Sequence, residues 1–183
     1  TTKDAITTID KINEGISDPS KVRVVGSITV HHLWITVDDW AGNPLNFCKP
    51  VAKLPSDKNA LIHAAMSGKP WFIFGSDSAP HPVENKSKHT GVSAGIFTQQ
   101  HALTYLTQVF EKYDSLDKLP NFVSKFPLQF YNVDPSLIQS PNDKVILYKR
   151  KHNINDKLIS KDGNITVIPY MPGCELNWDV KFM

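Results

Sequence analysis

Two short apolar segments separated by a helical pattern constrain the fold of this chain most strongly. Residues 22–30 are β-branched or apolar at both odd and even positions, and residues 71–74 read Trp-Phe-Ile-Phe. Strands that are buried on both faces have this composition, because helices cover both sides of a parallel sheet. Amphipathic helical patterns precede, separate and follow the two segments. The order helix, strand, helix, strand, helix predicts an α/β fold with parallel strands and helical crossovers.

The three helical patterns have recognisable ends. The first is predicted to begin after Thr2, a good N-cap, and to stop near Gly15. The second is predicted to begin at a cap on Ser56 and to end at Gly68, and the third to begin at Thr98. A shorter helix is expected at about 120–125, before a proline.

After residue 143 the pattern changes from helical to strand-like. Short strands are predicted at 145–148, 165–170 and 176–182, with a turn at Asp162–Gly163. Two parallel strands cannot form a stable sheet alone, and a complete eight-stranded α/β barrel typically needs about 250 residues. A chain of 183 residues is therefore expected to be part of a larger barrel, or to receive strands from another chain.

Composition excludes several classes of protein. The net charge is +2 and no Lys/Arg stripe is present, so a nucleic-acid surface is not expected. The longest strongly apolar run, 71–74, is far shorter than the ~20 residues of a membrane span. Cys48 and Cys174 lie far apart and form no CxxC pair, which excludes a zinc ribbon and a disulfide framework. We expect a cytoplasmic protein with two free thiols.

Polar side chains follow both predicted strands, where parallel α/β folds place reactive groups. Asp77 and His81 follow the second strand, and His31 and His32 follow the first. Asp77 is the leading candidate, because a carboxylate there can bind a metal ion or act as a general base. Two structural roles stay open: Asp77 could cap a turn, and His81 could bond its own loop. Adjacent strand residues point to opposite faces, so His31 and His32 are not expected to share a metal ion.

The segment 74–81, Phe-Gly-Ser-Asp-Ser-Ala-Pro-His, resembles the last-strand signature of the dihydroorotases, in their homodimeric single-function type within the amidohydrolase superfamily. The segment 26–33 resembles the preceding strand, and Asn-Phe-Cys-Lys-Pro at 46–50 resembles the long loop of fungal members. Three further segments fit in the same order: 93–97, 129–131 and 178–181. The resemblance covers essentially the whole chain.

This resemblance implies a (β/α)8 TIM-type barrel with a binuclear zinc centre. Its members interconvert N-carbamoyl-L-aspartate and L-dihydroorotate in pyrimidine biosynthesis. The chain is expected to form the C-terminal part of the barrel, with strands seven and eight and their helices at 1–143 and a strand-rich extension packed on the barrel at 144–183. Of the family's metal ligands only Asp77 is present. The N-terminal half of the enzyme is therefore the expected partner, in a cytoplasmic homodimer that binds neither nucleic acid nor membrane.

The resemblance also implies roles for single residues. Asp77 would be a zinc ligand and the general base. His81 would contact the substrate carboxylate, and Ala79, Ala94 and Lys49 would bind substrate, the last two mainly through their backbones. Without the other metal ligands, the chain alone is expected to be inactive and to aggregate through its open strand edges.

Two other readings stay open at this point. A dihydropyrimidinase or hydantoinase would share the fold, although the segment 75–81 followed by this tail favours a dihydroorotase. A non-catalytic half-barrel that serves as a scaffold or binding chain would keep the fold and lose the metals. Bound zinc together with turnover in the complete assembly would identify the enzyme.

Overall fold

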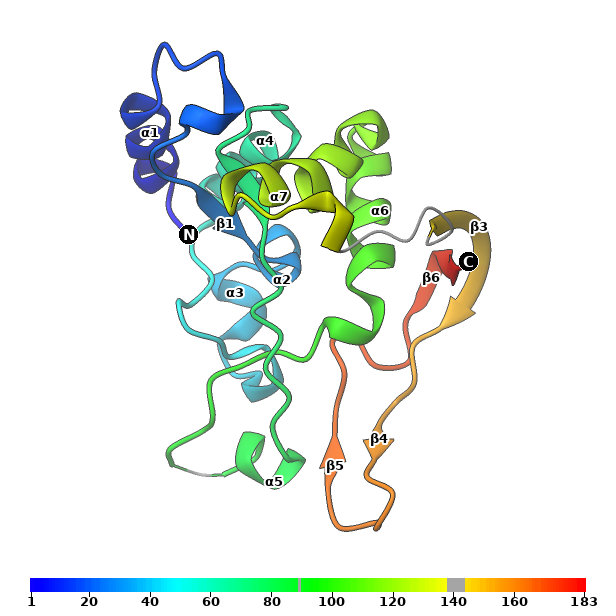
Figure 1. Cartoon of the computed structure of the whole chain (residues 1–183). Coiled ribbons are helices and arrows are strands. Elements are labelled where there is room, and N and C mark those ends of the chain that lie inside the picture. Colours follow the sequence, from blue (N-terminus) through cyan, green and yellow to red (C-terminus); the bar gives the residue numbers. More distant parts are fainter. Residues whose placement is uncertain (89, 138–143) are drawn as a thin grey trace.

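Within the residues that the computed structural model describes, the strands form three separate two-stranded sheets (Figure 1). The structure describes residues 1–88, 90–137 and 144–183. Strand β1 (Gly26–Ile28) pairs in parallel with β2 (Phe72–Phe74), and Gly26 lies opposite Phe72. Each of these strands pairs only with the other among the described residues, so each has a free edge. The predicted parallel pair with a helical crossover is confirmed.

The C-terminal strands lie on the other side of the molecule from β1 and β2 (Figure 1). Strand β3 (Val145–Asn153) pairs with β6 (Glu175–Phe182) in antiparallel fashion. Strands β4 (Leu158–Ile159) and β5 (Thr166–Val167) form a small antiparallel hairpin. The predicted turn at 162–163 closes this hairpin. The strand predicted at 165–170 is shorter than expected, whereas the one predicted at 145–148 is longer.

Three long helices surround the parallel pair. They are α1 (Lys3–Ile12), α4 (Pro55–Met66) and α6 (Ala102–Lys112). The Thr2 side chain accepts a hydrogen bond from the Ala5 N–H at 3.2 Å, as predicted for the cap of α1. The predicted cap of α4 was wrong, because Pro55 occupies the first turn and Leu54 is the cap residue.

Shorter helical turns fill the connections. The α-helical ones are α2 (Val30–Trp34), α3 (Val37–Trp40), α5 (Val83–Lys86) and α7 (Phe126–Phe130). The helix predicted at 120–125 is a π-helical turn, Asn121–Lys125, that continues into α7. Pro127 does not end it, because proline is tolerated in the first turn of a helix.

The first strand is shorter than the predicted range 22–30. The Thr29 side chain accepts a hydrogen bond from the His32 N–H at 3.4 Å and so caps α2, which begins at Val30. His31 and His32 therefore lie on a helical turn rather than on extended backbone. This corrects the premise that their rings must point to opposite faces.

One hydrophobic core joins the parallel strands to the C-terminal strands. It contains Phe72 from β2, Leu61 from α4, Leu106 from α6 and Leu176 from β6, all buried. The Tyr105 hydroxyl of α6 donates to the backbone oxygen of Tyr170 at 2.5 Å. The division of the chain between 143 and 144 stays a prediction, since residues 138–143 lie outside the described residues.

Candidate active site

Asp77 lies just beyond the C-terminal end of β2, with an exposed side chain. Its backbone φ is 39°, in the left-handed region that non-glycine residues seldom occupy. The neighbouring Ser78 fixes the loop, because its hydroxyl accepts the N–H groups of Thr98 (3.0 Å) and Gln99 (2.9 Å). The hydroxyl of Ser78, and not the carboxylate of Asp77, therefore holds this loop. An aspartate with an unusual backbone conformation at a strand end is typical of a functional position.

His81, Ala94 and Ala79 meet around Gly95. The Nε2 atom of His81 lies 3.0 Å from the Ala94 carbonyl oxygen, and the Ala79 N–H donates to the Ile96 oxygen at 3.0 Å. Gly95 has φ 153°, and a Cβ there would lie 2.6 Å from the Cβ of Ala79 and 2.8 Å from the His81 ring. The close approach therefore requires glycine. Three of the residues predicted to bind substrate are neighbours in the fold.

The loop that carries Lys49 reaches the same place through its backbone. The Gly95 N–H donates to the carbonyl oxygen of Phe47 at 2.9 Å, which joins the segment 46–50 to the segment 93–96. The Lys49 side chain itself is exposed. This arrangement is compatible with a backbone role for Lys49.

A cavity of about 380 Å³ opens beside this cluster. Ala79, His81, Lys86 and Gly95 line one wall, and the segment 168–172, between β5 and β6, lines another. Asp77, Lys49 and Ala94 are not among its lining residues. The cavity therefore lies beside the predicted substrate residues and does not contain all of them.

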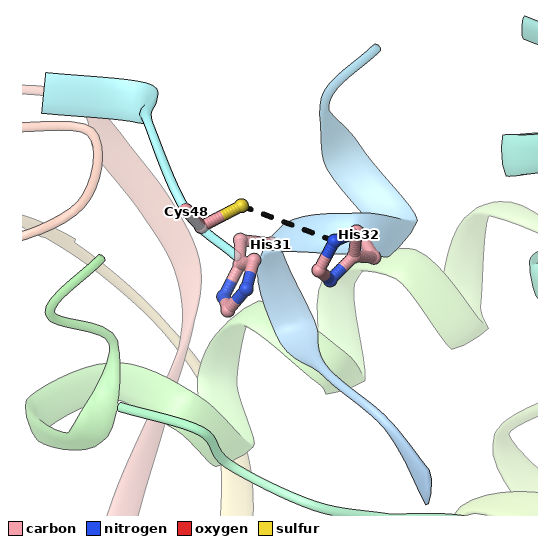
Figure 2. A group of neighbouring side chains, drawn as sticks. All are labelled: His31, His32 and Cys48. Atoms are coloured by element: carbon pink, nitrogen blue, oxygen red, sulfur yellow. Dashed lines mark hydrogen bonds between the residues drawn. The ribbon is translucent and has the colours of Figure 1, made fainter. Parts of the chain in front are cut away.

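A buried cluster of two histidines and a cysteine lies between α2 and the loop 46–50 (Figure 2). One ligand atom from each of His31, His32 and Cys48 lies within 4.8 Å of the others. The rings of His31 and His32 are 4.6 Å apart between centroids, since adjacent helical side chains diverge less than adjacent strand side chains. The premise that these two side chains point to opposite faces was wrong, whereas the expectation that they do not share a metal ion stays a prediction.

The hydrogen bonds of His32 give this cluster a structural role. Its Nε2 lies 2.8 Å from the Pro50 carbonyl oxygen and its Nδ1 lies 2.7 Å from the Thr29 hydroxyl. Because a carbonyl can only accept, Nε2 carries the proton, and the thiol of Cys48 donates to the same oxygen at 3.4 Å. Both ring nitrogens of His32 are thus engaged, and the ring attaches the loop 46–50 to α2.

Burial controls protonation in this cluster. Loss of solvent, and then the proximity of His32, lower the pKa of His31 to about 3, and neither of its ring nitrogens has a partner among the described residues. Burial also lowers the pKa of His32, although its bond to Pro50 and the negative charge of Asp77 oppose this. Burial raises the pKa of the Cys48 thiol. The cluster is therefore uncharged near neutral pH.

The sequence does not show the parts that Gly95, His32 and Lys86 play in this region, although His32 is among its candidate residues. Gly95 carries no side-chain chemistry, and His32 was assigned to extended backbone. Lys86 belongs to a polar loop, where a lysine is usually exposed, yet it is only 5% exposed here. Positive φ at Gly95 and burial at Lys86 become visible only in the folded chain.

No protein-family model matches the sequence. The chain is 50% identical over 182 residues to the dihydroorotase of Saccharomyces cerevisiae, covering 100% of this chain and 50% of that protein. It is 38% identical to a probable dihydroorotase of Schizosaccharomyces pombe, covering 97% of this chain and 48% of that protein. The chain thus spans about half the length of these curated relatives. No helix among the described residues has both the length and the apolar character needed to cross a membrane.

A solved structure agrees with this relationship. The crystal structure of Saccharomyces cerevisiae dihydroorotase in complex with 5-fluoroorotic acid superposes with a TM-score of 0.95 at 49% identity, over 100% of this chain and 50% of that one. The parallel strands and helices of this chain therefore form part of an amidohydrolase TIM-type barrel. The chain belongs to the dihydroorotase family and corresponds to the C-terminal half of its members.

Proposed function

We propose that this chain is the part of a dihydroorotase that carries Asp77 and the substrate loops. The enzyme would interconvert N-carbamoyl-L-aspartate and L-dihydroorotate in pyrimidine biosynthesis. The observation that carries the proposal is the 50% identity to the yeast enzyme over the whole of this chain. The free edges of β1 and β2 support a second half of the barrel as the partner. We further propose a homodimer in the cytoplasm, as in the family that the sequence resembles.

The exposed carboxylate of Asp77 fits the role of a zinc ligand. Asp77 is an exposed residue beyond the strand end, and carboxylate oxygen is an accepted ligand of zinc. The His31, His32 and Cys48 cluster fits a metal ion less well, since both ring nitrogens of His32 are engaged in hydrogen bonds. The remaining ligands would come from the other half of the barrel. When bound, the zinc ions would lower the pKa of a water molecule and supply a nucleophile near neutral pH.

Asp77 would move the proton during hydrolysis. As water attacks the ring carbonyl carbon of dihydroorotate, the carboxylate accepts the proton that the water releases. It then delivers this proton to the ring nitrogen while the C–N bond breaks, which yields N-carbamoyl-L-aspartate. A positioned general base contributes about 10²- to 10⁴-fold to such a rate.

The neighbouring loops would bind the substrate. His81 would contact the substrate carboxylate, with Ala79, Ala94 and Lys49 beside it. Their closeness around Gly95 supports this assignment. The yeast relative was solved with 5-fluoroorotic acid, and we infer that 5-fluoroorotate also binds the assembled form of this protein. Here "assembled enzyme" means this chain joined to the other half of the barrel, taken from the Saccharomyces cerevisiae relative.

The proposal is tested by comparing this chain alone with the assembled enzyme. Ring opening of L-dihydroorotate and bound zinc are measured for both. We expect turnover and bound zinc only in the assembled enzyme, because Asp77 is the only family ligand in this chain. The chain alone should also aggregate through the open edges of β1 and β2.

Each other outcome would contradict part of the proposal. Turnover by the chain alone would show that the missing ligands are not needed. An assembled enzyme that folds but neither binds zinc nor turns over would identify a scaffold. Turnover of dihydrouracil in place of dihydroorotate would identify a dihydropyrimidinase.

A further inference from the structure

Lys86, the last residue of α5, is a buried lysine whose ammonium group has three backbone partners. Its Nζ donates to the carbonyl oxygens of Phe47 (2.9 Å), Ser93 (3.0 Å) and Gly95 (2.8 Å). An ammonium group has three N–H donors, so all of them are engaged. Only 5% of the residue is exposed. The three hydrogen bonds and the burial together hold the ammonium group of Lys86 at one position.

The three carbonyl groups belong to the two loops that approach each other at the proposed substrate site. Phe47 precedes Lys49 in the loop 46–50, whereas Ser93 and Gly95 flank Ala94 on either side. The Gly95 N–H also donates to the Phe47 oxygen at 2.9 Å. The carbonyl of Ala94 points instead to His81. Lys86 thus fixes the peptide groups on both sides of the one that His81 contacts.

The electrostatics of Lys86 favour a role beyond packing. Burial lowers the pKa of Lys86, and the nearby Cys48 opposes this shift. None of the ion pairs within the described ranges involves Lys86, so its charge is balanced by carbonyl dipoles rather than by a carboxylate. A buried charge is costly unless it is hydrogen-bonded, so these three bonds compensate for the burial of the ammonium group. Lys86 also lines the 380 Å³ cavity together with Ala79 and His81.

We propose that Lys86 is a positioning residue that holds the two substrate loops at a fixed separation through its three carbonyl bonds. The proposal rests on the dihydroorotase function proposed above. A tighter or looser spacing would displace the Ala94 carbonyl from His81 and the Lys49 backbone from its place. Because these groups would bind substrate rather than move protons, loss of Lys86 should weaken binding more than it slows the chemical step.

The test uses the assembled enzyme with Lys86→Met, which keeps the apolar stem and removes the charge and all three donors. Lys86→Arg is the second variant, because it keeps the charge but its planar fork cannot reproduce the three-way geometry. Lys88→Met is the matched control, since Lys88 is an exposed lysine of the same loop. The readouts are KM and kcat for L-dihydroorotate, the dissociation constant for 5-fluoroorotate, bound zinc, and amide hydrogen exchange in segments 46–50 and 93–96.

For Lys86→Met we expect KM and the dissociation constant to rise at least about tenfold, the effect of losing one or more hydrogen bonds to a charged group. We expect kcat to change less than KM, zinc to stay bound, and the Gly95 amide to exchange faster. Lys86→Arg should give a smaller change in the same direction, and it serves alone if Lys86→Met does not fold. Lys88→Met should match the parent.

Parental KM and exchange rates in both variants would overturn the proposal. A lower melting temperature with an unchanged KM would overturn it too, since Lys86 would then be only structural. Failure of the underlying function looks different, because the parental assembled enzyme would then lack turnover. In that case hydrogen exchange still tests whether Lys86 holds the two loops together, and unchanged exchange would count against this role.

Discussion

The imidazole of His81 and the backbone carbonyl of Ala94, thirteen residues apart, are joined at 3.0 Å between Nε2 and oxygen. Because the carbonyl can only accept, His81 Nε2 must carry the proton. The other ring nitrogen, Nδ1, is then the atom left for a ligand, and it can donate to a carboxylate when the ring carries a proton on both nitrogens. The loop after β2 and the segment 93–96 therefore form one unit, in which the backbone of one orients the side chain of the other.

Replacing His81 by Ala in the assembled enzyme should weaken ligand binding and leave zinc in place. Loss of one hydrogen bond to a carboxylate costs about 1.5–3 kcal/mol, which corresponds to about a 10- to 150-fold rise in the dissociation constant for 5-fluoroorotate. Calorimetry measures the binding and metal analysis measures the zinc. His63→Ala, at an exposed histidine of α4, is the control. Loss of zinc as extensive as in an Asp77 variant would disprove the substrate-contact role.

Gly95→Ala should disrupt the site by steric overlap. The new Cβ would lie 2.6 Å from the Ala79 Cβ and would overlap the His81 ring, so overpacking of about 1–3 kcal/mol is expected. The matched control is Gly91→Ala, because Gly91 also has positive φ but a Cβ added there would meet nothing within 4 Å. Denaturant unfolding and 5-fluoroorotate binding are compared. Equal losses in both variants would show that backbone strain, and not the close approach, explains the need for glycine.

Burial of His31 should make the protein less stable in mild acid. Its pKa is about 3 in the folded chain, against an ordinary value of 6.5, so the unfolded state binds a proton first as the pH falls. Stability is then lost progressively below pH 6.5 and down to about pH 3, by about 2 kcal/mol at about pH 5. His31→Gln removes this titration.

We therefore expect the stability loss between about pH 7.5 and about pH 5 to be smaller by about 2 kcal/mol in His31→Gln than in the parent. Unfolding by urea at several pH values in the assembled enzyme measures it. His63→Gln, at an exposed position, should keep the parental slope. If the stability of His31→Gln falls with pH as steeply as that of the parent, then His31 takes up its proton as readily in the folded protein as in the unfolded chain.

Periodicity predicted the parallel pair and the long helices, because their burial patterns are local. It failed at residues 29–32, where β-branched Thr29 and Val30 favour a strand but the Thr29 side chain caps a helix. The pairing of His32 with Pro50, and of Lys86 with three distant carbonyls, depends on tertiary contacts that no local pattern encodes.

The predicted site residues also differ in whether the sequence itself carries a signal for them. Asp77 could be proposed from its chemistry and its place after a buried strand. Ala94 and Lys49 could be named only through the family resemblance, because backbone contacts leave no side-chain signal in a sequence. Gly95, which has no side chain at all, is explained only by the 2.6 Å approach to Ala79.

The most direct test of the account is kcat for Asp77→Asn in the assembled enzyme, measured together with the melting temperature. Asparagine keeps the shape of the side chain but cannot accept the proton and is a poorer zinc ligand, so kcat should fall about 10²- to 10⁴-fold while the fold survives. Asp114→Asn is the control, because Asp114 is also an exposed aspartate with positive φ, here 50°; it should match the parent. An Asp77→Asn enzyme that keeps more than about a tenth of the parental kcat, against that expected loss, would contradict the account.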